Sequence, residues 1–315
     1  MNEFALIDWI RGQAGPATSG VSLGIGDDAA VLALAPGESL VVTTDTLNSG
    51  VHFGDYDPAD SVGHKALAVN LSDLAAMGAA PRWFLLSLSL PKDSDAWVKA
   101  FVGGLLGLAR TMNVALVGGD TTAGKLSVTV TALGATRQGR FLSRDGARPG
   151  DWVVVSGELG DAALALQELS RGRSPDPSGV EKLRRPIPRV ELGATLVGNA
   201  TACIDLSDGL LADLGHIAGS SGCGAVVEAD RLPGSESLRS CPVEVRRALQ
   251  LTGGDDYELC FTWPEARRDE LAGIESDLGL KLSVVGRMVE GRGIRCLDSD
   301  GQPLAFEKQG YSHRL

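Results

Sequence analysis

Five segments of this chain place an aspartate, mostly beside glycine, at the end of an apolar strand-like run. They occur in both halves of the sequence, at residues 24–28, 43–46, 118–122, 204–208 and 253–256. Aspartate and glycine are common turn residues, so any one of these segments alone indicates only a turn. Five together indicate more, because strand ends in α/β folds border the crevice in which ligands bind. The pattern therefore predicts an α/β fold with an acidic ligand site.

The order of the apolar segments indicates two domains of mixed α/β (α+β) type. Strand-like and helix-like segments alternate through the first half, and glycine and proline then mark a boundary at 144–152. The second half restarts with a strand at 152–157. A length of 315 residues with 43% hydrophobic residues suits about two cores. We expect domains at 1–147 and 148–315, and we expect the loop at 172–179 to carry no chemistry.

Charge and cysteine content limit the partners and the compartment. The formal net charge of −11 argues against duplex nucleic acid and anionic membrane, since both need a basic surface. The N-terminus lacks the pattern of a secretory signal, and no stretch of about 18 apolar residues occurs. The odd set of cysteines contains no C-x-x-C pair, which favours reduced thiols and a cytoplasmic location. These cysteines are Cys203, Cys223, Cys241, Cys260 and Cys296.

Asp73 lies within a segment, residues 64–78, whose helix is apolar on nearly every side. Such a helix is largely buried, so this carboxylate should be paired or bound to a metal. On the strand at 39–46, alternation places Thr43 and Asp45 on one face and Thr44 on the other. A backbone carbonyl of Thr44 could still serve as a ligand. The two segments together favour a cation site.

Asp205 and Asp208 stand where a strand leads into a helix. Asp205 shares a strand face with Ser207 if the strand extends that far, whereas Asp208 could cap the helix that follows. Capping and metal binding are equally good interpretations of Asp208. Asp205 has no capping role in this arrangement, which favours a ligand role for it.

Two phosphate-binding motifs are matched only in part. Gly119, Gly124 and Lys125 fit G-x-x-x-x-G-K, but Leu126 replaces the hydroxyl residue that a P-loop requires, and a strand follows instead of a helix. Residues 24–29 mimic a dinucleotide fingerprint, yet two carboxylates there would repel a pyrophosphate. The histidines and serines show no triad spacing. A P-loop, a Rossmann site and a covalent hydrolase are therefore rejected.

Taken in order, GIGDDAAVL, TTDTLNSGVHF, HKALAVNLSDLAAMGA, GGDTT, CIDLSDGL and GGDDYELCF resemble the thiamine-monophosphate kinase family. That family shares an ATP-dependent superfamily with aminoimidazole ribonucleotide synthetase and selenophosphate synthetase. The resemblance covers nearly the whole chain. It implies the two-domain synthetase-like fold, in which the N-terminal domain forms a homodimer and the C-terminal α/β domain completes the active site.

The resemblance also implies transfer of the ATP γ-phosphoryl group to thiamine monophosphate, giving thiamine diphosphate, with several Mg²⁺ ions. Carried over by position, the metal ligands are Asp28, Thr43, Thr44, Asp45, Asp73, Asp120, Asp205 and Asp208. The nucleotide contacts are Gly119, Asp120, Arg144 and Ser207, and the substrate contacts are His52, Asp255 and Tyr311. Asp45, Asp120 and Asp208 are the residues expected to take part in catalysis.

The sequence departs from the family at two places, and two rival functions remain. Asn48 and Ser49 stand where the family more often has an apolar residue and an acid, and Asp255 replaces a longer glutamate.

A phosphate monoester is largely a dianion at pH 7, which explains why no general base is evident. The rivals are a kinase or ligase of the same superfamily with another acceptor, and a non-catalytic nucleotide or cation sensor.

Overall fold

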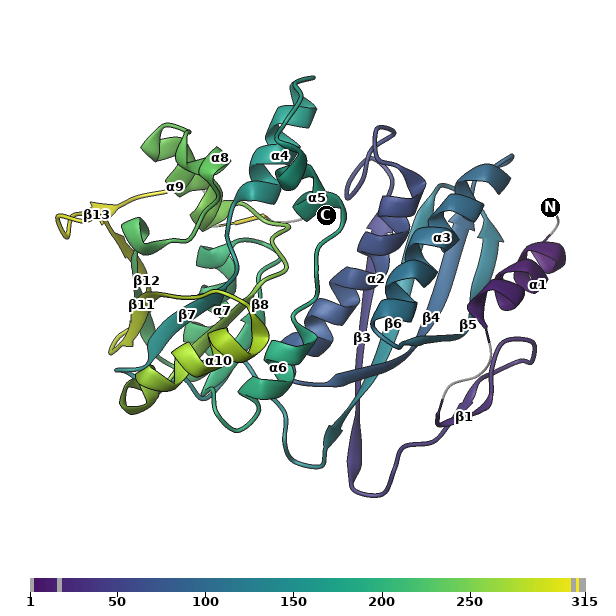
Figure 1. Cartoon of the computed structure of the whole chain (residues 1–315), viewed down its shortest axis with the longest axis horizontal. Coiled ribbons are helices and arrows are strands. Elements are labelled where there is room, and N and C mark those ends of the chain that lie inside the picture. The colour runs from purple at the N-terminus through teal and green to yellow at the C-terminus, as the bar shows by residue number, and fades with distance from the viewer. Residues whose placement is uncertain (1–2, 16–18, 307–309, 312–315) are drawn as a thin grey trace. The chain divides into compact units, whose positions relative to one another are not determined.

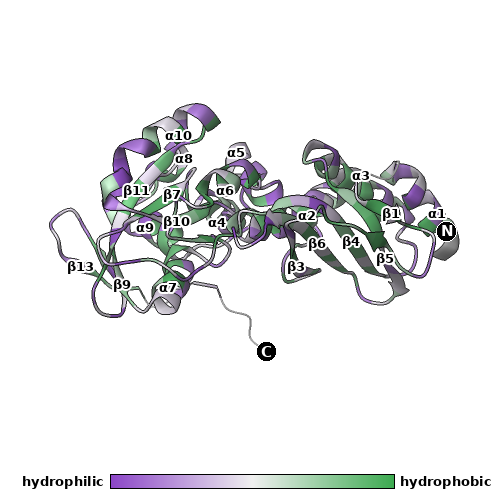
Figure 2. Ribbon diagram, turned by 90° about the horizontal axis from the view of Figure 1, so that it is seen from below, coloured by the Kyte–Doolittle hydropathy of each residue, from purple (hydrophilic) through white to green (hydrophobic). Residues whose placement is uncertain are grey.

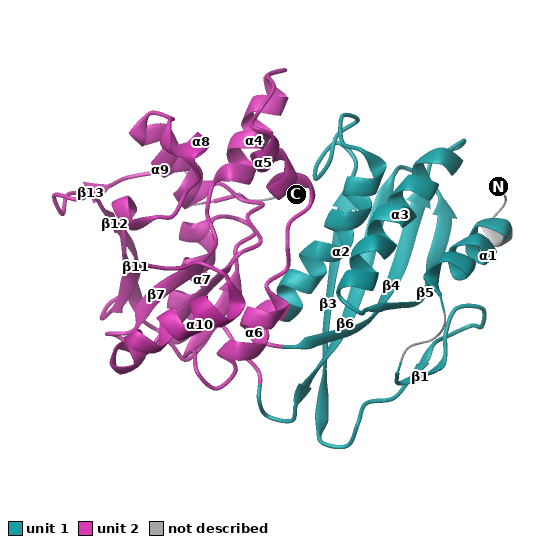
Figure 3. Cartoon of the chain, in the orientation of Figure 1, with its two compact units in different colours: residues 1–74, 79–140 teal, residues 75–78, 141–315 magenta. Residues whose placement is uncertain are grey.

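The chain, described here from a computed structural model, folds into two compact units (Figure 3). The structure describes residues 3–15, 19–306 and 310–311. Unit 1 comprises residues 1–74 and 79–140, and unit 2 comprises residues 75–78 and 141–315. Within the described part of the chain, no helix is both long and apolar enough to cross a membrane.

Unit 1 is built on a four-stranded sheet with the strand order β3-β6-β4-β5 (Figure 1). Strands β4 and β5 are parallel, whereas β6 pairs antiparallel with β3 and β4. The strands are β1 (Val21–Leu23), β2 (Val31–Leu32), β3 (Glu38–Asn48), β4 (Ala80–Leu90), β5 (Ala115–Ala123) and β6 (Ser127–Arg137). The helices are α1 (Glu3–Ala14), α2 (Ala59–Ala76) and α3 (Asp95–Thr111).

Helices α2 and α3 supply much of the core of unit 1. Leu67 and Leu71 of α2 and Phe101 of α3 pack in one cluster with Phe84 and Val130 of the sheet, and all five are fully buried. The expectation that α2 is buried on nearly all sides is confirmed by this packing. On the other side of the sheet, alternate residues of β3 are exposed. The helices therefore cover one side of this sheet, and along β3 the other side is exposed.

Two glycines allow α2 and α3 to approach closely. A Cβ on Gly63 of α2 would collide with the backbone oxygen of Phe101, and a Cβ on Gly104 of α3 would collide with the backbone oxygen of Asp60. The approach is therefore reciprocal, with one glycine on each helix. It holds α2, and with it Asp73, in a fixed place over the sheet.

Unit 2 contains a seven-stranded sheet with the order β13-β12-β9-β11-β7-β10-β8, in which only β12 and β9 are parallel neighbours. Its strands are β7 (Trp152–Ser156), β8 (Ala202–Asp205), β9 (Gly224–Glu228), β10 (Leu259–Trp263), β11 (Leu282–Val289), β12 (Gly293–Leu297) and β13 (Pro303–Leu304). Its helices are α4 (Asp161–Ser170), α5 (Pro177–Arg184), α6 (Val190–Leu196), α7 (Leu210–Ser221), α8 (Glu236–Arg239), α9 (Val243–Thr252) and α10 (Leu271–Leu278).

Both sides of this sheet are covered by helices. Val153 and Val155 of β7 pack in a cluster with Leu214 of α7, whereas Val154 packs in a second cluster with Leu192 of α6 and Leu271 of α10. Strands β7 and β10 are accordingly buried along nearly their whole length and mostly apolar (Figure 2). A strand buried on both sides reads as a continuous apolar run, as WVVVS does. The mixed α/β class predicted from the sequence is confirmed.

One local expectation was wrong. The segment 172–179, expected to be a loop, contains the start of α5, because Asp176 accepts the N–H of Ser178 and Pro177 occupies the first turn. The apolar segment 29–34 forms only the short strand β2, Val31–Leu32, in a ribbon with β1. The expected domain boundary at 147/148 falls seven residues after the change of unit at 140/141.

Candidate active-site residues

Thr43, Asp45 and Asp73 come together in unit 1. Alternation along β3 points Thr43 and Asp45 to the side that α2 covers, and Asp73 lies on α2. The hydroxyl of Thr43 donates to Oδ2 of Asp73 at 2.5 Å. Burial, and then the charge of Asp73, raise the pKa of Asp45 to about 6. Two carboxyl groups are thus held together at the cost of electrostatic repulsion.

The side chain of Thr44 lies on the opposite side of the sheet, as the alternation predicted. Its hydroxyl contacts Oγ1 of Thr131 at 3.0 Å and donates to the backbone oxygen of Val130 at 3.2 Å. The hydroxyl of Thr44 therefore serves the strand pairing between β3 and β6. A metal role for this residue could involve only its backbone.

Asp120 is exposed on β5, at the other edge of the same sheet. The ladder pairs Asp120 with Ser87 of β4, and Ser87 with Thr129 of β6, whose hydroxyl contacts that of Thr46. Because residues opposite one another in a ladder point to the same side, Asp120 lies on the exposed side of the sheet. Within unit 1, Asp120 is thus not brought beside Asp45. Gly119 before it approaches Leu86 so closely that no Cβ could fit.

Asp28 and His52 lie in loops of unit 1. Asp28 is exposed, and its N–H donates to Oδ1 of Asp27 at 2.8 Å. The N–H of Asn48, at the end of β3, donates to Nδ1 of His52 at 3.0 Å. An imidazole nitrogen that accepts carries no proton, so the ring proton of a neutral His52 lies on Nε2. This tautomer can donate a hydrogen bond to an anionic substrate.

The junction of β8 and α7 carries the acidic pair of unit 2. Asp205 is buried at the end of β8, and α7 begins at Leu210 with Gly209 as its N-cap. No side chain caps this helix, so the capping interpretation of Asp208 is wrong. A Cβ on Gly209, which has a φ of 114°, would crowd Thr252 and Gly253. Only glycine suits that position.

Asp213 is the residue that replaces Asp208 in holding this turn, and the sequence analysis missed it. Asp213 is the fourth residue of α7, and its Oδ2 accepts the N–H groups of Asp208 and Gly209, each at 3.1 Å. Burial, and then the charge of Asp208, raise the pKa of Asp213 to about 7. An aspartate four residues after a helix N-cap, inside the apolar stretch LLADL, is the signal that could have revealed it.

Two of the remaining predicted residues of unit 2, Asp255 and Tyr311, lie at the same junction, whereas Arg144 lies near the end of α7. The N–H of Asp255 donates to the backbone oxygen of Ser207, and the N–H of Tyr311 donates to that of Asp208, both at 3.0 Å. Arg144 is exposed, and its backbone oxygen accepts the hydroxyl of Ser221 at 3.2 Å. Unit 2 thus brings residues from three distant parts of the sequence to one junction: Asp205, Ser207 and Asp208, then Asp255, and then Tyr311.

The predicted metal ligands are divided between the two units, with Asp205 and Asp208 in unit 2 and the others in unit 1. No group of three or more His, Cys, Asp or Glu side chains there is arranged to hold a metal ion. Unit 1 offers a pair of carboxyl groups, Asp45 and Asp73. Mg²⁺ is commonly held by one or two carboxylates together with waters and substrate phosphates, so such a pair suits it.

Comparison with known proteins places the whole chain in one group. Family models match the chain twice: AIR synthase related protein, N-terminal domain, at residues 26–136, and AIR synthase related protein, C-terminal domain, at residues 148–298. The thiamine-monophosphate kinase of Escherichia coli (strain K12) is 44% identical over 319 residues, which cover 99% of this chain and 98% of that protein.

Solved structures give the same result. The thiamine-monophosphate kinase of Stenotrophomonas maltophilia K279a is 48% identical with a TM-score of 0.88, covering 96% of this chain and 98% of its own. A structure described as AaThiL complexed with AMPPCP and TMP is 33% identical with a TM-score of 0.78, covering 99% of this chain and 97% of its own.

Proposed function

This chain belongs to the AIR synthase related family and, within it, to the thiamine-monophosphate kinases, and we propose that it transfers the γ-phosphoryl group of ATP to thiamine monophosphate. The products are thiamine diphosphate and ADP. The observation that carries the proposal is the identity of 44% over nearly the full length of a protein with that name. A relative that holds AMPPCP and TMP supports both substrates. The predicted synthetase-like fold and family are thereby confirmed.

The chemistry suits a site without a general base. The phosphate of thiamine monophosphate has a second pKa of about 6, so at neutral pH its oxygen is already an anionic nucleophile. Catalysis of phosphoryl transfer then depends on positioning and on compensation of charge. Hydrogen-bond donors such as Nε2 of His52 and the exposed guanidinium of Arg144 would orient the anionic substrates.

We propose that Mg²⁺ binds at the aspartates. When bound, it neutralises charge on the phosphates and on the group in transfer. Asp45 and Asp73, held together despite their repulsion, would hold one ion. Asp205 would supply a carboxylate from the end of β8, and Asp208 from the turn that precedes α7. The further ligands that we propose are Asp28, Thr43, Thr44 and Asp120.

The other contacts remain proposals of the same kind. Gly119, Asp120, Arg144 and Ser207 would contact ATP, and His52, Asp255 and Tyr311 would contact thiamine monophosphate. Asp45, Asp120 and Asp208 would take part in catalysis. The arrangement of Ser207, Asp255 and Tyr311 around one junction supports a shared task for these residues.

We propose that the protein is a homodimer joined through unit 1. On the side of the sheet that the helices leave open, Leu40 and Val42 of β3 are 47% and 54% exposed. Apolar side chains in one row on an exposed sheet are typical of an interaction surface. A second copy of the chain presents the same row, as a twofold interface requires.

We propose a cytoplasmic location. All five cysteines are free thiols, and each of them except Cys241 is buried. A chain with buried free thiols suits a reducing compartment.

One assay separates the proposed function from its rivals. The protein is incubated with ATP and Mg²⁺, with and without thiamine monophosphate, and ADP is measured. ADP formation that depends on thiamine monophosphate supports the proposal. ADP formation only with another phosphorylated or carboxylated acceptor would indicate a different kinase or ligase of the superfamily. Binding of ATP without ADP formation under any condition would indicate a sensor.

A further inference from the structure

The loop at 253–258, which joins α9 to β10, has a backbone that side-chain-bearing residues seldom adopt. Asp255 and Tyr257 have φ angles of 69° and 49°. Left-handed backbone is unfavourable for residues other than glycine, above all for a bulky one such as tyrosine. Such a conformation persists only where the surrounding structure imposes it, and it is concentrated at functional sites.

Main-chain hydrogen bonds join both residues to the end of β8. The N–H of Asp255 donates to the backbone oxygen of Ser207 at 3.0 Å, and the N–H of Tyr257 donates to that of Leu206 at 2.8 Å. These bonds fix where the loop lies along β8. They do not involve the side chain of the residue between the two, Asp256, which has a different partner.

Asp256 is bound to the start of α4. Its Oδ1 and Oδ2 accept the N–H of Gly160 at 2.9 Å and 3.1 Å. Gly160 is the N-cap of α4, where the helix dipole favours an acidic group. The side chain of Asp256 therefore ties the middle of the loop to the start of α4.

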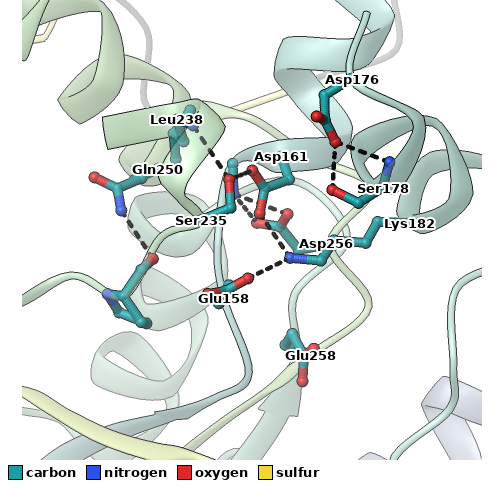
Figure 4. A network of polar contacts seen from close by, with 12 residues as sticks. Glu158, Asp161, Asp176, Ser178, Lys182, Ser235, Leu238, Gln250, Asp256 and Glu258 are labelled. Atoms are coloured by element: carbon teal, nitrogen blue, oxygen red, sulfur yellow. Dashed lines mark hydrogen bonds and ion pairs between the residues drawn. The ribbon is translucent and has the colours of Figure 1, made fainter. Parts of the chain in front are cut away.

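The partner of Asp256 is itself held in place (Figure 4). Nζ of Lys182 donates to Glu158 at 2.7 Å and to Asp161 at 2.6 Å. These two acids flank Gly160 in the sequence, so Lys182 ties together the turn that presents its N–H. A short hydrogen bond from Ser235 adds a further constraint on Asp161.

We propose that Asp256 is a positioning residue, which sets the backbone of Asp255 through its bond to Gly160 and thereby the binding of thiamine monophosphate. This inference rests on the proposed function and on the proposed contact between Asp255 and the substrate. Asp255 is one methylene shorter than the glutamate more often found there. A shorter side chain cannot correct a displaced backbone, so its reach depends on the loop.

The test compares Asp256→Ala with wild type in steady-state kinetics. The alanine variant loses the acceptor for Gly160, and KM for thiamine monophosphate should rise at least about tenfold, since small displacements of positioning groups have large effects. KM for ATP should change little, because β8 remains paired with β10. A rise in both constants by the same factor would indicate general disruption and would overturn the proposal.

Two matched variants separate positioning from stability. Asp256→Asn keeps a carbonyl oxygen for the N–H of Gly160, so its KM for thiamine monophosphate should return close to that of wild type. Asp230→Ala removes another aspartate of unit 2, which holds Arg247 at 2.7 Å, and should lower the melting temperature while leaving both KM values unchanged. An asparagine variant as impaired as the alanine variant would overturn the acceptor role.

Hydrogen exchange gives a readout that does not depend on activity. In Asp256→Ala, the amides of the peptide 253–258 should exchange faster than in wild type, while the amides of β8 and β10 keep their protection. If the alanine variant does not fold, the same comparison is made with Asp256→Ser. Unchanged exchange in the loop would contradict the proposal. Wild-type protein without kinase activity would instead contradict the proposed function, so the two failures are distinguishable.

Discussion

Asp45 and Asp73 are two carboxyl groups held close together in unit 1, and their repulsion has consequences for both catalysis and stability. The hydroxyl of Thr43 satisfies one oxygen of Asp73 but carries no charge to offset either acid. A bound cation would offset both. Natural proteins keep such pairs where a function requires them, because neighbouring carboxylates repel each other.

At this scale we expect Asp45→Asn to lower kcat by at least about two orders of magnitude, the loss typical when electrostatic stabilisation of a transition state is removed. Asp120→Asn should have an effect of the same size if Asp120 takes part in catalysis. Circular dichroism should be unchanged in both variants. Near-normal rates with intact folds would mean that these aspartates are only turn and strand residues.

The raised pKa of Asp45 also predicts a pH-dependent effect on stability in the presence of a chelator. The folded protein binds a proton at Asp45 up to a pH of about 6, whereas an unfolded aspartate releases it near 3.8. Stability therefore falls as pH rises from about 4 to about 6, by as much as about 3 kcal/mol for a shift of this size.

Asp45→Asn removes that loss. Thermal unfolding with chelator should show the variant to be more stable than wild type at pH 8 and close to it at pH 4. A variant less stable than wild type at pH 8 would show that the charge of Asp45 has a partner in the metal-free protein.

At the scale of elements, the contact of α2 with α3 depends on glycine. Gly63 and Gly104 each approach the backbone of the other helix too closely for a Cβ. We expect Gly104→Ala to destabilise the protein by about 1–3 kcal/mol, the usual effect of overpacking. Gly103→Ala is the matched control, because Gly103 lies one position earlier on α3 with open space around it. It should be neutral or stabilising by up to about 1 kcal/mol. Chemical denaturation measures both, and equal effects would refute the packing role.

Many elements could be predicted from the sequence, but some local contacts could not. Helix α2 and strand β3 have long, regular apolar patterns, and both were predicted correctly. Helix α5 was missed because the weight given to glycine and proline concealed the cap at Asp176. Asp208 was interpreted as a possible cap because the spacing of Asp213 from Gly209, the signal for the residue that holds that turn, was overlooked.

At the scale of the whole molecule, the candidate site residues could be predicted from the sequence, but the contacts between them could not. The hydrogen bond from Thr43 to Asp73 joins residues 30 positions apart, and the one from the N–H of Leu259 to Oγ of Ser156 joins residues 103 positions apart. Such contacts depend on the complete topology of each unit. Asp120 is an example. The resemblance to the family implies that it is a metal ligand together with Asp45, whereas the strand pairing places it at the other edge and on the other side of the sheet.

The proposed homodimer predicts that a charge on the open side of the unit 1 sheet separates the subunits. Val42→Asp should shift the molecular mass in light scattering from that of a dimer to that of a monomer, because a charge would be buried without a partner. Ile187→Asp is the control, since Ile187 of unit 2 is 60% exposed and should leave the mass unchanged. A monomeric wild-type protein, or a dimer that survives Val42→Asp, would refute this interface.

The transfer reaction itself is tested most directly by following the phosphorus atom. ATP labelled in its γ-phosphoryl group is incubated with the protein, Mg²⁺ and thiamine monophosphate, and the labelled products are separated and identified. Direct transfer predicts that the label appears in the terminal phosphate of thiamine diphosphate, in an amount equal to the ADP formed. Label found only in inorganic phosphate, or ADP formed without thiamine diphosphate, would contradict a kinase acting on thiamine monophosphate.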